Sequence, residues 1–435
     1  MFESEVQIKL MEKLIKVLKE SPISEYKISE VHSESVELFY VLNKLETNRA
    51  TDIHEIEVTI YVDVEDKRGQ SSFSYNSFMS EEELKELISK KIYAAKFALN
   101  PFFEIPGPSE DQPVHIPSNF EDYSLLEAGE KVVKAVLAAK QYKEGTYSAN
   151  EIFVTKKTQR ILNSKGIDVS STSYKGFIEL IPSWEVGEEE VETYTSFEFS
   201  SLDEKEITRK VNEAMLLTKA RFEAEPLKLD KPVKVIIEGS DNVNYFNFFV
   251  DDLSYQAKYQ KMNRFELDTD VQEGGSGDKL NITLLPVYEG ASGSRAFDRD
   301  GVVLKEVEII KDSVAKAQHG SYTFGYYLGV KNPTGNLPII KVEAGSKSFE
   351  DMKKEPYVRC VKFSSFQLEE NSGFFGGEVR LGFYFDGEKE IPVTGFSIAG
   401  NIHESKKNAV FSKEILVYSE YVGPKYLEFK DMTIN

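Results

Sequence analysis

The sequence has a single cysteine, Cys360, and only five histidines among its 435 residues. One cysteine excludes an intramolecular disulfide, and so few histidines leave few candidate metal ligands. His54 and His403 each precede a glutamate, but neither is followed by a second histidine at the spacing of a metallopeptidase helix. Cys360 alternates with apolar neighbours in YVRCVKF, which predicts a buried structural thiol rather than a nucleophile or ligand.

Long apolar segments and basic runs are also missing. No stretch approaches the roughly 18 apolar residues of a membrane span, and the start MFESEVQIKL has no apolar segment typical of secretion. The net charge is -20 and no Lys/Arg run exceeds two residues, so the surface repels a phosphate backbone. We therefore expect a soluble, cytoplasmic protein that contacts neither membrane nor nucleic acid directly.

The first half of the sequence contains the same order of elements twice. An amphipathic helix at 3–20 precedes alternating strands at 35–48 and 54–75, and the capping box Ser80/Glu83 opens a helix that runs to Asn100 before Pro101. After a proline-rich passage the order returns as a helix at 123–140, strands at 151–163, 171–184 and 188–200, and a helix at 201–226 opened by Ser201/Glu204. The pattern predicts a duplication with an offset of roughly 120 residues, and two unrelated αββα units are the alternative.

From Pro232 onward, strand patterns separated by glycine and aspartate turns dominate. This pattern of strands and turns predicts an antiparallel sheet or barrel. The predicted fold class is α+β. A duplicated αββα domain occupies residues 1–228, with copies at about 1–105 and 120–228, and a mostly antiparallel, barrel-like domain occupies residues 229–435.

Composition and spacing alone reveal no active site. The sequence contains no GxSxG elbow, Walker loop or dinucleotide fingerprint. His319, in AKAQHGSYTFGYYLG, lies beside glycines and aromatic residues of the kind that line grooves, although a turn histidine is the alternative. The stretch NYFNFFVDDLSYQ, 244–256, combines aromatic residues with an acidic pair and predicts a short helix, which is either a site or core.

Several passages resemble the TldD/PmbA family, once called modulators of DNA gyrase. In the second half these are FDRDGVVLKEVEIIKD, YYLGVKNPTGNLPIIKVEAG and, most specifically, GGEVRLGFYFDGEKEIPVTGFSIAGNI. The helix SEEELKELISKKIYAAKFA of the first half resembles the family as well, so the likeness covers nearly the whole chain. The resemblance implies a cytoplasmic metallopeptidase family whose members act on unfolded or small peptides.

The sequence departs from the family at the residues that make its members enzymes. In TldD-type members, the strand that VKVIIEG resembles leads into a helix with HExxxH, whose histidines hold zinc and whose glutamate is the base. Here these positions fall on Asn247, Phe248 and Asp252, next to Asp251, and no shift of register finds a histidine. The resemblance thus implies the PmbA (TldE) branch, which lacks the motif and pairs with a TldD subunit.

We therefore expect a non-catalytic subunit with no catalytic residue, metal or other cofactor of its own, and zinc in an HExxxH-bearing partner. His319, Gly395, Gly400 and Asn401 are candidates for a peptide groove, where the glycines allow close backbone approach or serve only as turn residues. One alternative is a self-sufficient metal-dependent peptidase with ligands among Asp251, Asp252, Glu238 and His319. Another is a homodimeric peptide-binding protein without an enzymatic partner.

Overall fold

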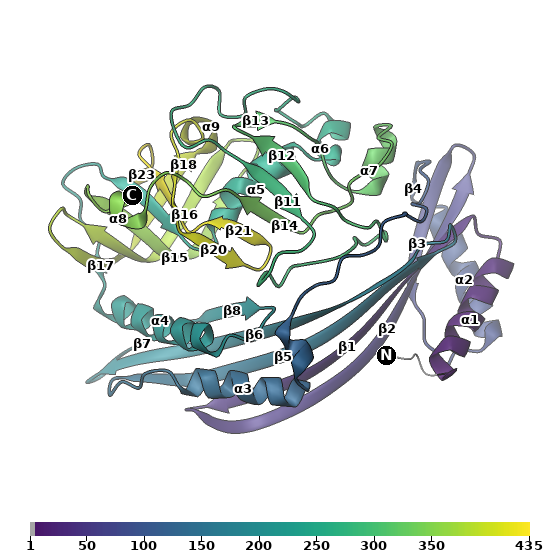
Figure 1. The fold of residues 1–435 in the computed structure, drawn as a ribbon, viewed down its shortest axis with the longest axis horizontal. Helices are drawn as coiled ribbons and strands as arrows, with labels where there is room; N and C mark the ends of the chain where they lie inside the picture. The colour runs from purple at the N-terminus through teal and green to yellow at the C-terminus, as the bar shows by residue number, and fades with distance from the viewer. Residues whose placement is uncertain (1–4) are drawn as a thin grey trace.

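A computed structural model describes residues 5–435 of the chain (Figure 1). It confirms the α+β fold class, with mostly antiparallel sheets. In these residues the sheets are open rather than closed into a barrel. No helix within residues 5–435 is both long and apolar enough to cross a membrane.

The first sheet is built from the first half of the chain in the order β4–β3–β2–β1–β5–β6–β7, with β8 also pairing with β6. Its strands are β1 (Glu25–Val41), β2 (Lys44–Val64), β3 (Lys67–Ser74), β4 (Leu99–Pro101), β5 (Gly145–Asn163), β6 (Asp168–Val186), β7 (Glu189–Glu192) and β8 (Thr195–Phe199). The predicted charged strand at 188–200 is thus two strands. The strand predicted at 54–75 likewise falls into two strands, with a turn at Glu65 and Asp66 between β2 and β3.

Two long antiparallel hairpins, β1–β2 and β5–β6, form the centre of this sheet (Figure 1). Leu42 and Asn43 make the first hairpin turn with φ of +46° and +60°. β1 then pairs antiparallel with β5 along most of its length, from Lys27↔Asn163 to Val41↔Ala149. This pairing joins the two predicted repeats into one sheet, while the duplication and the domain boundaries stay predictions.

Helices cover one face of this sheet in two separate groups. They are α1 (Glu5–Glu20), α2 (Glu81–Ala95), the 3₁₀ helix η1 (Asn119–Asp122), α3 (Leu125–Leu137) and α4 (Glu204–Glu223). α1 and α2 bury Leu14, Leu18 and Ile88 against one end of the sheet, and α3 and α4 bury Val132 and Val211 against the other. Figure 1 shows the two groups at opposite ends of the long strands.

Two of the predicted helix ends differ from those in the structure. The Ser80/Glu83 capping box of α2 is confirmed, but α2 ends at Ala95, and Leu99–Pro101 instead form β4 beside β3. The predicted Ser201/Glu204 box is wrong, because Asp203 caps α4 and its carboxylate accepts from the backbone N–H groups of Lys205 and Glu206. α3 begins with a capping box that the sequence analysis missed, Ser124/Glu127.

The second half of the chain forms two further sheets. The larger has the order β19–β22–β10–β15–β16–β17–β9, with β18 on β16 and β23 on β18, and the smaller has the order β13–β12–β11–β14–β21–β20. Their strands are β9 (Glu225–Pro226), β10 (Lys234–Glu238), β11 (Ile282–Leu285), β12 (Val307–Lys311), β13 (Val314–Ala315), β14 (Ile339–Val342), β15 (Tyr357–Leu368), β16 (Phe374–Phe385), β17 (Glu390–Thr394), β18 (Phe396–Asn401), β19 (Val410–Phe411), β20 (Ile415–Tyr418), β21 (Tyr421–Pro424), β22 (Tyr426–Phe429) and β23 (Thr433–Ile434). The short helices between them are α5 (Asn242–Asp252), α6 (Tyr255–Gln260), α7 (Tyr322–Tyr327), α8 (Phe349–Met352) and α9 (Ile402–Ser405).

The two halves of the chain contact each other across the face of the first sheet opposite the helices, and α4 also contacts β16 and β17 of the second half. Lys27 of β1 forms an ion pair with Asp300 at 2.6 Å. Ile161 and Ile167 pack with Ala296 and Phe297 in a small buried cluster. The Tyr327 hydroxyl of α7 donates to the Pro101 carbonyl at 2.8 Å.

Candidate functional site

The aromatic stretch singled out in the sequence forms helix α5, which lies between the two sheets of the second half. β10 is buried at all five positions, between the parallel β15 and the antiparallel β22. Gly239, with φ of +105°, turns the chain from β10 into α5, a conformation that favours glycine. The Asn242 side-chain amide then donates to the Lys425 carbonyl at 2.9 Å. The predicted single helix is two helices, because Ser254 begins α6 by accepting from the Ala257 N–H.

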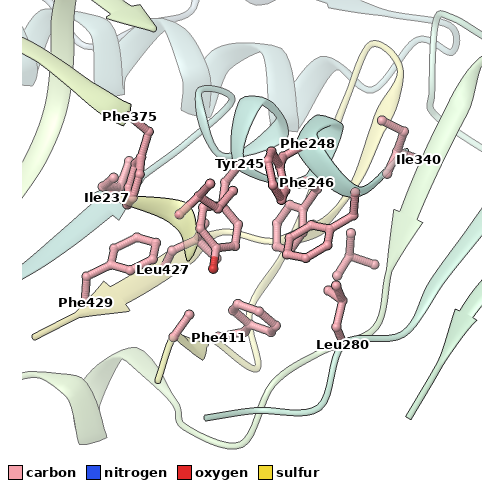
Figure 2. Close-up of a cluster of buried hydrophobic side chains, with 14 of the residues drawn as sticks. Ile237, Tyr245, Phe246, Phe248, Leu280, Ile340, Phe375, Phe411, Leu427 and Phe429 are labelled. Atoms are coloured by element: carbon pink, nitrogen blue, oxygen red, sulfur yellow. The ribbon is translucent and has the colours of Figure 1, made fainter. Parts of the chain in front are cut away.

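The aromatic side chains of α5 are part of the main hydrophobic core. Tyr245, Phe246, Phe248 and Phe249 are each at most 1% exposed. They pack against rings from several strands, as Figure 2 shows for Phe375, Phe411 and Phe429, and the Tyr245 and Phe375 centroids are 5.6 Å apart. Burying each such ring contributes about 1.5–3 kcal/mol. The stretch is therefore core.

The motif position that would hold the catalytic base is one of these core residues. The Phe248 ring meets the rings of Phe265 and His403 edge-on, with centroids 6.0 and 5.5 Å away. The Arg264 guanidinium lies 5.3 Å from the Phe248 ring centre. A phenyl ring cannot accept a proton from water, so this position cannot supply a base.

Asp252, at the second histidine position, is bound to the backbone that follows α6. Its carboxylate accepts from the Phe265 N–H at 2.8 Å and from the Arg264 N–H at 2.8 and 3.0 Å. The Arg264 guanidinium adds a contact at 3.3 Å, and Asp252 is only 5% exposed. These bonds occupy the lone pairs that a cation would need.

Asp251 lies in a shallow recess beside Glu370 and makes no side-chain hydrogen bond within residues 5–435. The surrounding protein and the Glu370 charge raise the pKa of the Asp251 carboxyl to about 6. Asn247, at the first histidine position, is partly exposed. Within residues 5–435, neither Asp251 nor Asn247 belongs to a group of three candidate metal ligands.

The other ligands of the self-sufficient alternative are engaged elsewhere. Glu238 forms ion pairs with Arg359 and, at 3.0 Å, with Lys425. His319 is 8% exposed, and its Nε2 donates to the Val250 carbonyl at 2.8 Å, next to the end of α5. Burial lowers the pKa of His319 and keeps it neutral. Across residues 5–435 no three His, Cys, Asp or Glu side chains converge as metal ligands. The residues that the structure describes therefore do not fit a zinc ion.

The predicted groove residues Gly395, Gly400 and Asn401 flank or end β18. Gly395 has φ of +73° in the β17–β18 turn, with open space around it. A Cβ on Gly400 would lie 2.8 Å from the Phe375 ring. The Asn401 side chain caps α9 by accepting from the His403 N–H at 2.9 Å. Each residue thus has a role in the fold, and the peptide-groove role stays a prediction.

β18 and α9 lie next to α5, because Phe375 contacts both Gly400 and Tyr245, and His403 contacts Phe248. The structure therefore brings Gly400, Asn401 and the degenerate motif positions to one region. His319 also meets this part of α5, at the Val250 carbonyl. Gly395 lies apart from them at the strand turn.

Sequence reasoning missed the residues that hold Asp252 in place, Arg264 and Phe265, and the residues around the start of α5. Lys362 of β15, Asp241 before α5 and Lys210 of α4 line one cavity although they are far apart in the sequence. No local pattern marks them, since only the pairing of β10 with β15 and the contact between the two halves place them together.

Comparison with known proteins gives a consistent result. The family model for the PmbA/TldA metallopeptidase C-terminal domain matches residues 233–435. No curated protein sequence matches the chain significantly.

Solved structures match over the whole chain. TldE from Thermococcus kodakarensis matches with a TM-score of 0.78 at 17% identity, covering 98% of this chain and 99% of that one. A protein named as a modulator of a DNA gyrase from Thermotoga maritima matches with a TM-score of 0.77 at 18% identity, covering 98% and 100%. Another so named, from Bacteroides thetaiotaomicron, matches with a TM-score of 0.78 at 16% identity, covering 99% of each chain. At these identities the likeness concerns the fold. Residues 233–435 thus belong to the family of the PmbA/TldA metallopeptidase C-terminal domain, and the whole chain shares the fold of these solved structures.

Proposed function

We propose that the chain is a non-catalytic subunit of a TldD/TldE-type zinc metallopeptidase complex. In this role it completes a dimer with an HExxxH-bearing subunit, encloses the partner's zinc chamber and helps to hold an unfolded or small peptide. The observation that carries the proposal is the state of α5. The position of the base holds the buried Phe248, and the Asp252 carboxylate accepts hydrogen bonds from the backbone N–H groups of Arg264 and Phe265.

An uncovered strand edge supports association with another chain. From Lys44 to Ile56, β2 pairs with β1 only, since β3 joins it from Glu57 onward. Apolar side chains along this stretch are exposed, including Leu45 at 49% and Ile53 at 48%. Such an edge presents unpaired backbone groups to another chain. The same geometry suits a second copy of this chain, so a homodimer is the competing assembly.

The alternative of a self-sufficient metal-dependent peptidase requires several side chains to leave their present partners. Asp252, Glu238 and His319 would each have to leave their present partners and converge on one ion. This rearrangement would take Asp252 from Arg264 and Glu238 from Lys425, and would leave Arg359 with Glu390 alone. No contact in residues 5–435 favours that arrangement.

Reconstitution tests the proposal. The chain is purified alone and together with an HExxxH-bearing TldD-type subunit from the same genome, and cleavage of an internally quenched, unstructured peptide is measured. We expect cleavage only by the pair. Replacing the partner's motif glutamate with glutamine should abolish cleavage, whereas Asn247→Ala in this chain should leave it unchanged. Chelator-sensitive cleavage by this chain alone would contradict the proposal, and a chain that binds only itself would favour the homodimeric peptide-binding alternative.

A further inference from the structure

A cavity of about 640 Å³ lies where the two halves of the chain meet. α4 and β8 line one side, and the β10–α5 turn, β15 and β20 line the other. Figure 1 shows α4 and β8 lying directly against the second half of the chain. The volume falls within the ~300–1,000 Å³ of ordinary ligand pockets, which occur preferentially between domains.

Three partly buried charged side chains in this cavity form no ion pair within residues 5–435, although Lys362 and Asp241 attract each other. Within residues 5–435, Lys362 of β15 and Asp241 of the β10–α5 turn form neither an ion pair nor a side-chain hydrogen bond. Lys210 of α4 makes only a cation–π contact, with its Nζ 5.1 Å from the Phe197 ring centre. Arg209 pairs with Glu206 and Glu213, and Lys425 pairs with Glu238, while Asp203 and Glu289 add exposed carboxylates to the lining.

The protein around these groups makes their charges costly. Burial lowers the pKa of both Lys362 and Lys210, although nearby carboxylates oppose the shift. Burial likewise raises the pKa of Asp241, against the opposing charge of Lys362. These side chains are partly exposed, so their partial burial costs only part of the hydration free energy of a charge, and a ligand of opposite charge would recover it. The cavity therefore offers sites for both an anion and a cation.

The remaining lining is partly apolar. Phe199 and Leu217 come from the first half, and Leu416, Val417 and Tyr418 come from β20. A cavity lined by apolar residues and by groups of both charges matches a molecule that carries an ammonium group, a carboxylate and an apolar side chain. Free amino acids and short peptides have this chemistry.

We propose that the cavity binds a small zwitterion of the amino-acid or short-peptide class. Lys362 and Lys210 hold its carboxylate, Asp241 holds its ammonium group, and β20 contacts its apolar side chain. All of these residues belong to this chain, so the site does not depend on the partner subunit proposed above.

Calorimetric titration of the full-length chain tests this site. The probes are the tripeptide Ala-Leu-Ala with free ends, its N-acetylated and C-amidated forms, and leucine. We expect saturable binding of the free tripeptide, with each capped form binding about tenfold or more weakly, because a charge-assisted hydrogen bond is lost. Binding of leucine with the same dependence on charge also supports the proposal and assigns the single amino acid as the ligand. No binding of either free probe at millimolar concentration would overturn it.

Substitutions at the proposed contact residues test whether the probes bind in this cavity. Lys362→Met should weaken binding of the free tripeptide about tenfold and leave binding of the amidated form unaffected, while Lys362→Arg should retain binding of the free tripeptide. Asp241→Asn should remove the preference for a free amino end. Lys205→Met, at an exposed position of α4 outside the cavity, is the matched control and should bind as the parent does. Thermal unfolding verifies that each variant is folded, and unchanged binding in folded Lys362→Met and Asp241→Asn would overturn the proposal.

Discussion

At the scale of single residues, Asp252 shows how a carboxylate at a catalytic-motif position can have a purely structural role. It joins the end of α5 to the chain beyond α6 through the backbone of Arg264 and Phe265. A sequence shows an acidic residue at this position, but whether its lone pairs are free depends on where residues 12 and 13 positions further on fold.

Asp252→Asn should destabilise the protein by about 1–3 kcal/mol, because the amide NH₂ group would face backbone N–H donors that the carboxylate now satisfies. Urea unfolding at pH 7 measures the change. Asp251→Asn is the control and should lose no stability, since its side chain makes no hydrogen bond to the backbone. Equal stability of Asp252→Asn and the parent would show that these bonds contribute little.

Asp251 should make stability depend on pH in the opposite sense to a salt-bridged carboxylate. Its pKa is raised to about 6 in the folded state, so its contribution is present below the unfolded pKa and is lost as pH rises through about 6. Asp251→Asn should therefore be more stable than the parent at pH 7 and no more stable at pH 3.5. The side chain is open to solvent, so the gain should stay below about 1 kcal/mol. A gain that is the same at both pH values would contradict the raised pKa.

At the scale of elements, patterns confined to a few residues predicted helix starts correctly, whereas the sequence could not decide between two neighbouring candidate caps. The Ser80/Glu83 box was readable because both residues act within one turn. Ser201 and Asp203 are both suitable caps two residues apart, and the sequence does not show which one adopts the extended conformation of an N-cap. The end of α2 was placed too late because Leu99–Pro101 pair with β3, a tertiary contact that Pro101 does not reveal.

The two candidate caps of α4 can be separated by mutation. Asp203→Ala should destabilise the protein by about 0.5–2 kcal/mol, because two backbone N–H groups lose their acceptor. Ser201→Ala removes no cap and should change the stability by less than about 0.5 kcal/mol. Chemical unfolding of both variants gives the comparison, and a larger loss for Ser201→Ala would restore the cap inferred from the sequence.

At the scale of the whole molecule, the fold class and the repeated order of elements could be predicted, but the pairing of the repeats could not. β1 meets β5 across more than 100 residues of sequence, from Lys27↔Asn163 to Val41↔Ala149. Alternating side chains define the faces of a strand but do not identify its neighbour. The same limit explains why Lys210, Asp241 and Lys362 gave no signal, since the contact between the two halves is what creates their cavity.

The central claim of the proposed function is that this chain binds no zinc of its own, because a buried ring and a backbone-bound carboxylate occupy two of the three motif positions in α5. Metal content tests it most directly, by plasma mass spectrometry of the chain purified alone and dialysed without chelator. The account predicts much less than one zinc per chain, and stoichiometric zinc only in the complex with an HExxxH-bearing partner. One tightly bound zinc per isolated chain would contradict the account and require Asp251, Asp252, Glu238 or His319 to leave their present surroundings.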